Sequence, residues 1–208
     1  MSQSGSAPYE QGIKLILASS SPRRQELLKG MGLDFEIIAS DADETVEESL
    51  SPREIVETLA VRKAEAVSAS LPGSYAPDRT VIIGSDTIVV LGGEVLGKPK
   101  DERDALRMLS ALQGQTHEVF SGVACLSADR RNVSVSHRRT KVTMKTMDEQ
   151  RILRYIGTGE PSDKAGAYAI QGIGATLIEG IEGDYFNVVG LPVSLLSEML
   201  ETFGIRVI

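Results

Sequence analysis

The chain has 208 residues, of which 41% are hydrophobic and 25% charged, and its formal net charge is -7. A chain of this length can bury a substantial core in one large domain or in two lobes. The acidic balance argues against a generic DNA or RNA binder, which needs a basic face, and the absence of Trp disfavours a base-stacking surface. Because Cys125 is the only cysteine, a disulfide framework and a cysteine-based zinc site are both excluded.

The first residues, 1–12, are polar and contain Gly and Ser, so we expect a disordered N-terminal extension followed by a single catalytic domain over residues 13–208. The apolar stretch Ile13 to Ala18 is too short for the core of a signal peptide, and no apolar run reaches membrane-spanning length. We therefore expect a cytoplasmic protein with neither a membrane nor a nucleic acid as its partner.

Strands and helices are predicted in a mixed order along the first half of the chain. Ser51-Pro52-Arg53-Glu54 is a capping box with proline at the first helical position, so it predicts a helix start. The expected elements are a strand at 14–18, a helix from Pro22, a strand at 35–38, a helix from 52, apolar strand runs at 80–84 and 88–91 with a turn at Gly92-Gly93, and a helix capped by Asp101.

The second half continues with two antiparallel strands and then alternates again. The expected elements are strands at 117–128 and 132–146, a helix opened by the capping box Thr146 to Glu149, a hairpin of strands 175–181 and 185–189, and a last helix from Pro192. Because strands and helices do not alternate strictly, we predict an α/β fold with a mixed sheet.

The segment Ser21-Pro22-Arg23-Arg24 places two arginines in the first turn of a helix capped by Ser21. The helix dipole is positive there, so the arginines are favourable only if an anion shares the site with the free N–H groups. An arginine side chain can also donate two parallel hydrogen bonds to the oxygens of one phosphate. The segment therefore predicts a phosphate site, although it is not a Walker loop. The structural alternative is a solvated helix start whose arginines pair with nearby carboxylates.

Asp86 stands between the two apolar runs, so its carboxylate lies near the core if the stretch passes through the sheet. A buried carboxylate needs a cation, a metal or several donors. The alternative is an exposed loop at the end of the strand, where functional groups of α/β folds also gather.

Several further residues have a functional and a structural interpretation. Lys63 and Lys98 are cations that could reach phosphates, or ordinary surface lysines. The acidic cluster Asp41, Asp43 and Glu44 could supply hard oxygen ligands to Mg²⁺ or be a solvated loop. Gln171 lies beside glycines that let the backbone approach a ligand, or simply form a turn.

Taken together, these segments resemble the Maf family. The segments are LASSSPRR (17–24), Glu44, Arg62-Lys63-Ala64, GSDTIV (84–89), GKP (97–99), LQGQTHEVFSGV (112–123), DKAGAYAIQG (163–172) and NVVGLP (187–192). The resemblance implies an elongated α/β fold like that of inosine triphosphatases, with two lobes around a central cleft. It also implies a nucleoside triphosphate pyrophosphatase that uses a divalent cation, Mg²⁺ or Mn²⁺, and is commonly a homodimer.

The resemblance also implies roles for single residues. Arg23, Thr87 and Gln171 match the branch that acts on dTTP and UTP, where they would shape substrate choice, with Ser21 and Arg24 beside the phosphates. Asp86 would accept the proton or hold the metal together with Glu44, and Lys63 and Lys98 match positions at the catalytic cleft. The family's association with septum formation leaves open a nucleotide-binding regulator of cell division. A phosphatase that releases orthophosphate is the other enzymatic alternative.

Overall fold

The computed structural model describes residues 12–47 and 49–208. The predicted disordered extension, residues 1–12, therefore lies outside the described residues except for Gly12. No helix in the described ranges is both long enough and apolar enough to cross a bilayer.

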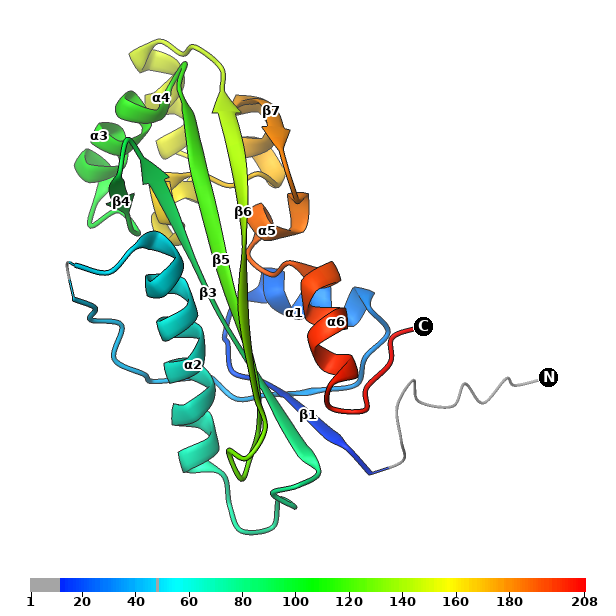
Figure 1. The fold of residues 1–208 in the computed structure, drawn as a ribbon. Helices are drawn as coiled ribbons and strands as arrows, with labels where there is room; N and C mark the ends of the chain where they lie inside the picture. The colour runs from blue at the N-terminus through cyan, green and yellow to red at the C-terminus, as the bar shows by residue number, and fades with distance from the viewer. Residues whose placement is uncertain (1–11, 48) are drawn as a thin grey trace. The chain divides into compact units, whose positions relative to one another are not determined.

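A seven-stranded sheet has the order β2-β1-β3-β5-β6-β7, with β4 paired to β3 (Figure 1). The strands are β1 (Lys14–Leu17), β2 (Glu36–Ile37), β3 (Thr80–Leu91), β4 (Glu94–Leu96), β5 (Thr116–Ser127), β6 (Val133–Met144) and β7 (Ile178–Glu182). β1 pairs in parallel with β2 and with β3, whereas the β3–β4 and β6–β7 pairs are antiparallel. The predicted α/β fold with a mixed sheet is confirmed.

The chain forms two compact units, each with its own hydrophobic core. The first unit comprises residues up to Asp86 together with Gly122–His137 and Gly190–Ile208, and the second comprises Thr87–Ser121 and Arg138–Val189. The two units match the expectation of two lobes. The expected central cleft, the elongated outline and the grouping of residues 13–208 into one catalytic domain stay predictions.

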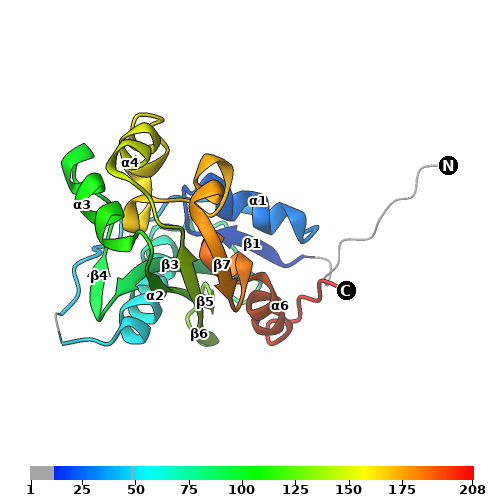
Figure 2. The same ribbon diagram turned by 90° about the horizontal axis from the view of Figure 1, so that it is seen from above.

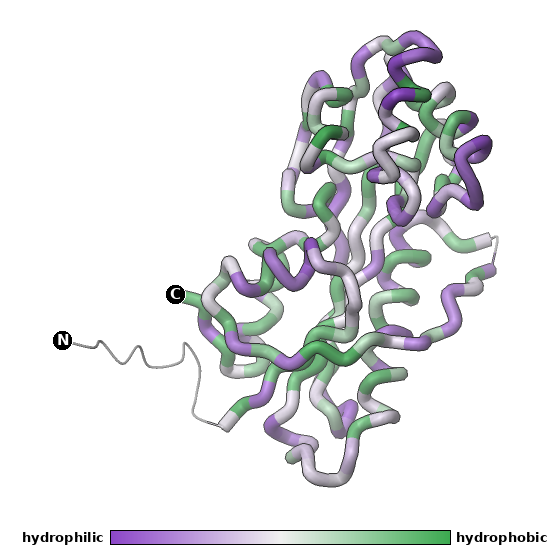
Figure 3. Tube along the Cα trace, turned by 180° about the vertical axis from the view of Figure 1, so that it is seen from behind, coloured by the Kyte–Doolittle hydropathy of each residue, from purple (hydrophilic) through white to green (hydrophobic). Residues whose placement is uncertain are grey.

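In the first unit, helices cover both faces of the sheet. Successive residues of β1 point to opposite faces, so the strand packs against helices on each side. Leu15 and Leu17 pack in one cluster with residues of α1 (Pro22–Gly30) and α6 (Val193–Glu201). Ile16 and Ala18 pack in another cluster with α2 (Pro52–Ser70). The apolar run of β1 is the green stretch that follows the grey N-terminal trace in Figure 3.

Two glycines let α2 lie directly on the strands. A Cβ atom at Gly84 on β3 would lie 2.1 Å from the Ala60 carbonyl oxygen, and one at Gly122 on β5 would lie 2.2 Å from the Val56 carbonyl oxygen. Any side chain at either position would therefore push α2 away from the sheet. The predicted capping box of α2 is confirmed, since Ser51 and Glu54 exchange both hydrogen bonds.

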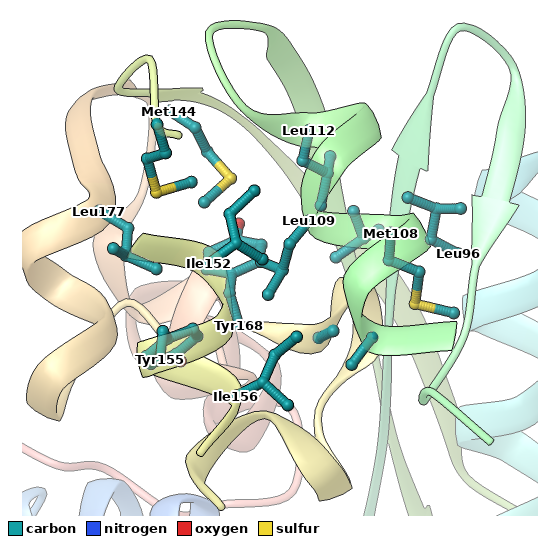
Figure 4. Close-up of a cluster of buried hydrophobic side chains, with 14 of the residues drawn as sticks. Leu96, Met108, Leu109, Leu112, Met144, Ile152, Tyr155, Ile156, Tyr168 and Leu177 are labelled. Carbon is teal, nitrogen blue, oxygen red and sulfur yellow. The ribbon is translucent and has the colours of Figure 1, made fainter. Parts of the chain in front are cut away.

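In the second unit, α3 (Glu102–Leu112) and α4 (Glu149–Ile156) lie side by side, as Figure 2 shows. Leucine, isoleucine and methionine side chains of both helices meet Tyr155 and Tyr168 in one cluster (Figure 4). Three short 3₁₀ helices complete the unit: η1 (Glu160–Asp163), η2 (Ala165–Ala167) and η3 (Gly172–Leu177).

Two predictions for this unit are wrong. Tyr185–Val189 is the helix α5 rather than a strand, and β7 pairs with β6 instead of with that segment. The Asp184 carboxylate accepts a hydrogen bond from the Phe186 N–H, which favours a turn at the start of the segment. The expected capping box at Thr146 is also absent, because Asp148 is the N-cap of α4 and accepts from the Arg151 N–H.

Candidate active site

The first turn of α1 has the local structure that the sequence predicts for this helix start. Ser21 is the N-cap in extended conformation, Pro22 begins the helix, and the Ser21 side chain makes no capping hydrogen bond. The first turn carries no acidic residue. Its backbone N–H groups and Arg23, which is partly exposed, therefore present positive charge at one helix end.

Arg24 differs from its neighbour because it is anchored within the first unit. Its Nε donates to the Gly190 carbonyl oxygen at 2.8 Å, and its Nη1 donates to the Ser19 hydroxyl at 3.4 Å. Burial lowers the pKa of Arg24 below its ordinary value, and the charge of Asp86 partly opposes this shift. Arg24 thus ties the start of α1 to the segment before α6, which gives it a structural task beside the expected contact with substrate.

Asp86 lies inside β3 and is only 8% exposed, so the continuous strand places its carboxylate near the core. Its counter-ion is Lys63 on α2, whose Nζ lies 2.6 Å from Asp86 Oδ1. The sequence required a cation, a metal or several donors for this carboxylate, and the structure provides a cation. The close packing of α2 at Gly84 sets the distance between the helix and the strand that this ion pair needs.

Glu44 joins the same ion pair from the loop that precedes α2. Lys63 Nζ lies 2.7 Å from Glu44 Oε1, and the Glu44 side chain is 57% exposed whereas that of Lys63 is 13% exposed. The neighbouring Arg62 donates to the Thr45 carbonyl oxygen and so holds the loop against α2. The consecutive Arg62 and Lys63 therefore have separate tasks: one binds the loop backbone and the other its carboxylate.

The two carboxylates around Lys63 suit a hard divalent cation. Mg²⁺ and Mn²⁺ prefer oxygen ligands, and Mg²⁺ is usually held by one or two carboxylates with substrate phosphates and water. Within residues 12–47 and 49–208, no cluster of three or more His, Cys, Asp and Glu side chains could hold a metal. Asp86 and Glu44 could each supply one oxygen ligand to such a cation.

Thr87, the next residue of β3, belongs to the second unit and is partly exposed. Its hydroxyl lies 2.8 Å from the hydroxyl of Ser121 on β5. Ser121 donates to the Asn187 carbonyl oxygen at 2.7 Å, so Thr87 is the donor to Ser121.

Lys98 and Gln171 also belong to the second unit. Lys98 is exposed after β4, and the preceding Gly97 carbonyl accepts from the Gly166 N–H at 3.0 Å. Gln171 directly precedes η3, is partly exposed, and its side chain does not cap that helix. The structure thus brings together Arg24, Glu44, Lys63 and Asp86 in the first unit, while Thr87, Lys98 and Gln171 lie in the other.

Sequence reasoning missed the residues that hold these side chains in place. Ser121 and Asn187 lie within the quoted segments 112–123 and 187–192 but had no assigned role. Asn187 is fully buried, and its amide donates to the Val119 carbonyl and to the Thr140 hydroxyl. A buried asparagine in an apolar segment was the available signal, since such a side chain needs partners.

A family model and curated relatives match this chain over nearly its whole length. A family model described as Maf-like protein matches residues 14–203. A protein of Desulforamulus reducens named dTTP/UTP pyrophosphatase is 50% identical over 194 residues, which cover 93% of this chain and 98% of that protein. One of Pelotomaculum thermopropionicum with the same name is 50% identical over 195 residues, covering 94% and 99%. Among solved structures, the Staphylococcus aureus Ham1 protein aligns with a TM-score of 0.45 and 18% identity, covering 79% of each chain.

Proposed function

The chain belongs to the family of Maf-like proteins, and from this premise we propose that it is a nucleoside triphosphate pyrophosphatase acting on dTTP and UTP. The observation that carries the proposal is the group of Lys63, Asp86 and Glu44 in a chain about half identical to proteins named dTTP/UTP pyrophosphatase. In the proposed reaction, water adds to the α-phosphorus and the bond to the bridging oxygen breaks. The products are the nucleoside monophosphate and pyrophosphate.

The start of α1 binds the phosphates in this proposal. The free N–H groups after Ser21 and the guanidinium of Arg23 donate to phosphate oxygens, and the helix dipole favours their negative charge. Arg24 adds positive charge close to Asp86 while it anchors Gly190. By resemblance to the family, Lys98 is proposed as a further cation for the phosphates.

Asp86 is the proposed proton acceptor for the attacking water. Lys63 binds Asp86 Oδ1 and fixes the orientation of the carboxylate, so the proton transfer is assigned to the second oxygen. Glu44 is a proposed ligand of a divalent cation, Mg²⁺ or Mn²⁺, and Asp86 would join it through the same second oxygen if it holds the metal instead of taking the proton. When bound, the cation would neutralise phosphate charge and polarise the phosphoryl group. Lys63 partly offsets the negative charge of the two carboxylates, which would otherwise repel the triphosphate.

Thr87 and Gln171 are the proposed determinants of base choice. Thymine and uracil carry an N3–H donor where cytosine has an acceptor, and a threonine hydroxyl oxygen is able to accept from that N3–H. The Gln171 amide offers both a donor and an acceptor to a base edge. By resemblance to the family, we further propose a homodimer in the cytoplasm, which size-exclusion chromatography with light scattering would test for the assembly.

A substrate panel with identified products tests the proposed activity. The purified chain with Mg²⁺ should release pyrophosphate and the monophosphate from dTTP and UTP, with lower kcat/KM for CTP, dCTP, ATP and GTP. Release of orthophosphate instead would support the phosphatase alternative. Tight binding of dTTP without hydrolysis would support a nucleotide-binding regulator.

A further inference from the structure

The backbone before and after Gln171 is hydrogen-bonded by two side chains that have no assigned role, Tyr155 and Glu160. Tyr155 lies on α4 and is 3% exposed, and Glu160 begins η1. Both belong to the second unit, as does the whole segment from Tyr168 to Leu177.

C-terminal to Gln171, two consecutive backbone N–H groups donate hydrogen bonds to Glu160. Its Oε2 accepts from Ile173 at 3.0 Å, and its Oε1 accepts from Gly174 at 2.8 Å. Burial raises the pKa of Glu160, but the hydrogen bonds from Gly174, Tyr155 and Ile173 together lower it below its ordinary value. The carboxylate therefore serves as the acceptor for the first turn of η3.

N-terminal to Gln171, the Tyr155 hydroxyl accepts a hydrogen bond from the Ala169 N–H at 3.1 Å. The same hydroxyl donates to Glu160 Oε1 at 2.9 Å. One phenol and one carboxylate, bonded to each other, thus hold the backbone two residues before Gln171 and two and three residues after it.

The glycines around Gln171 allow this close approach. A Cβ atom at Gly172 would lie 2.6 Å from Glu160 Oε2, and one at Gly174 would lie 2.3 Å from the Ala169 carbonyl oxygen and 2.6 Å from the Tyr155 hydroxyl. Gly172 also has φ of +65°, which other residues rarely adopt. The sequence left open whether these glycines admit a ligand or form a turn, and in the structure they give room to the clamp formed by Tyr155 and Glu160.

We propose that Tyr155 and Glu160 are positioning residues that fix the backbone on both sides of Gln171 and thereby set the enzyme's discrimination between nucleotide bases. The inference rests on the proposed function, in which the Gln171 amide contacts the base. An amide discriminates bases only if its donor and acceptor are held in register with the base edge, because a mobile amide can reorient to suit another base.

Glu160→Gln is an informative variant because it is nearly isosteric. A glutamine has one acceptor oxygen and one amide donor, so it cannot accept from the three donors of Ile173, Gly174 and Tyr155 together. Tyr155→Phe keeps the ring in the core of Figure 4 and removes only the hydroxyl. Tyr168→Phe is the matched control, since the Tyr168 hydroxyl bonds to His117 rather than to the clamp.

The experiment compares kcat/KM for UTP and CTP in the wild type and these variants, alone and combined with Gln171→Ala. We expect Glu160→Gln and Tyr155→Phe to reduce the UTP-to-CTP ratio about tenfold, and Tyr168→Phe to leave it within about twofold. In the Gln171→Ala background neither clamp variant should change the ratio further, because both act through Gln171. Amide hydrogen exchange at Ile173 and Gly174 should accelerate in Glu160→Gln.

Each outcome has a distinct consequence. Clamp variants that lose activity on UTP and CTP equally, with an unchanged UTP-to-CTP ratio, would show a merely structural role and overturn the inference. The inference would also be overturned if the clamp variants lower this ratio in the Gln171→Ala background as much as they do in the wild type. If one variant fails to fold, the other clamp residue gives the same test. A wild-type enzyme without pyrophosphate release would overturn the proposed function and this inference together, and that result is read before any variant is made.

Discussion

Lys63 places its ammonium nitrogen 2.6 Å from the Asp86 carboxylate, although the two residues lie 23 positions apart on a helix and a strand. Glu44 binds the same nitrogen from a loop. One ammonium thus gathers two carboxylates from separate elements, and the account of the site depends on this arrangement.

Lys63→Met should destabilise the protein because it leaves the nearly buried Asp86 without its cation. Removing one partner of a buried ion pair typically costs about 3–5 kcal/mol. We expect about 3 kcal/mol because only one of the two carboxylates bound to Lys63 is buried, and the other, Glu44, is largely solvated. Urea denaturation, analysed for the free energy of unfolding, measures this change.

The matched control for that change is the double variant Lys63→Met with Asp86→Asn. Asparagine removes the uncompensated charge, so much of the lost stability should return. If the costs of the two substitutions simply add, Lys63 and Asp86 are not energetically coupled, which would contradict a stabilising ion pair between them.

Gly84→Ala should displace α2 and so separate Lys63 from Asp86. The added methyl group would meet the Ala60 carbonyl at 2.1 Å, and overpacking of this kind costs about 1–3 kcal/mol. We expect a lower melting temperature together with a lower kcat. Gly30→Ala is the control, because a Cβ atom there has no atom within 4 Å and alanine favours a helix. Equal effects of the two substitutions would argue against a positioning role for Gly84.

His117 should make the protein less stable as the pH falls from about 6.5 to 4. Burial lowers the pKa of His117 from 6.5 to about 4, so between these values the unfolded chain binds a proton that the folded chain does not. Stability therefore rises with pH across this window and is fully present above it, by roughly 3 kcal/mol in total. Comparing the free energy of unfolding against pH for the wild type and His117→Asn isolates the contribution. An identical slope in both proteins would contradict it.

The features that depend on local sequence were predictable. Ser21 and Pro22 begin α1 as expected, and Ser51 and Glu54 form the expected capping box. The need of Asp86 for a partner also followed from its apolar neighbours, because a carboxylate in such a run cannot remain uncompensated.

The features that depend on distant contacts could not be predicted. Nothing near Arg24 indicates that it binds Gly190, which lies 166 positions away. Glu160 escaped notice because two of its partners are backbone N–H groups, which leave no side-chain pattern. Tyr185–Val189 was assigned wrongly because a short apolar run has no clear period, and the cap from Asp184 decided for a helix.

Asp86→Asn provides the most direct test of the central claim, that this carboxylate serves the hydrolysis of dTTP and UTP. Pyrophosphate release from dTTP is measured for the wild type, for Asp86→Asn and for Asp78→Asn, which changes an exposed aspartate in a loop. The account predicts that Asp86→Asn lowers kcat by about 100-fold or more while folding normally, and that Asp78→Asn keeps wild-type activity. Turnover of Asp86→Asn close to that of the wild type would contradict the account.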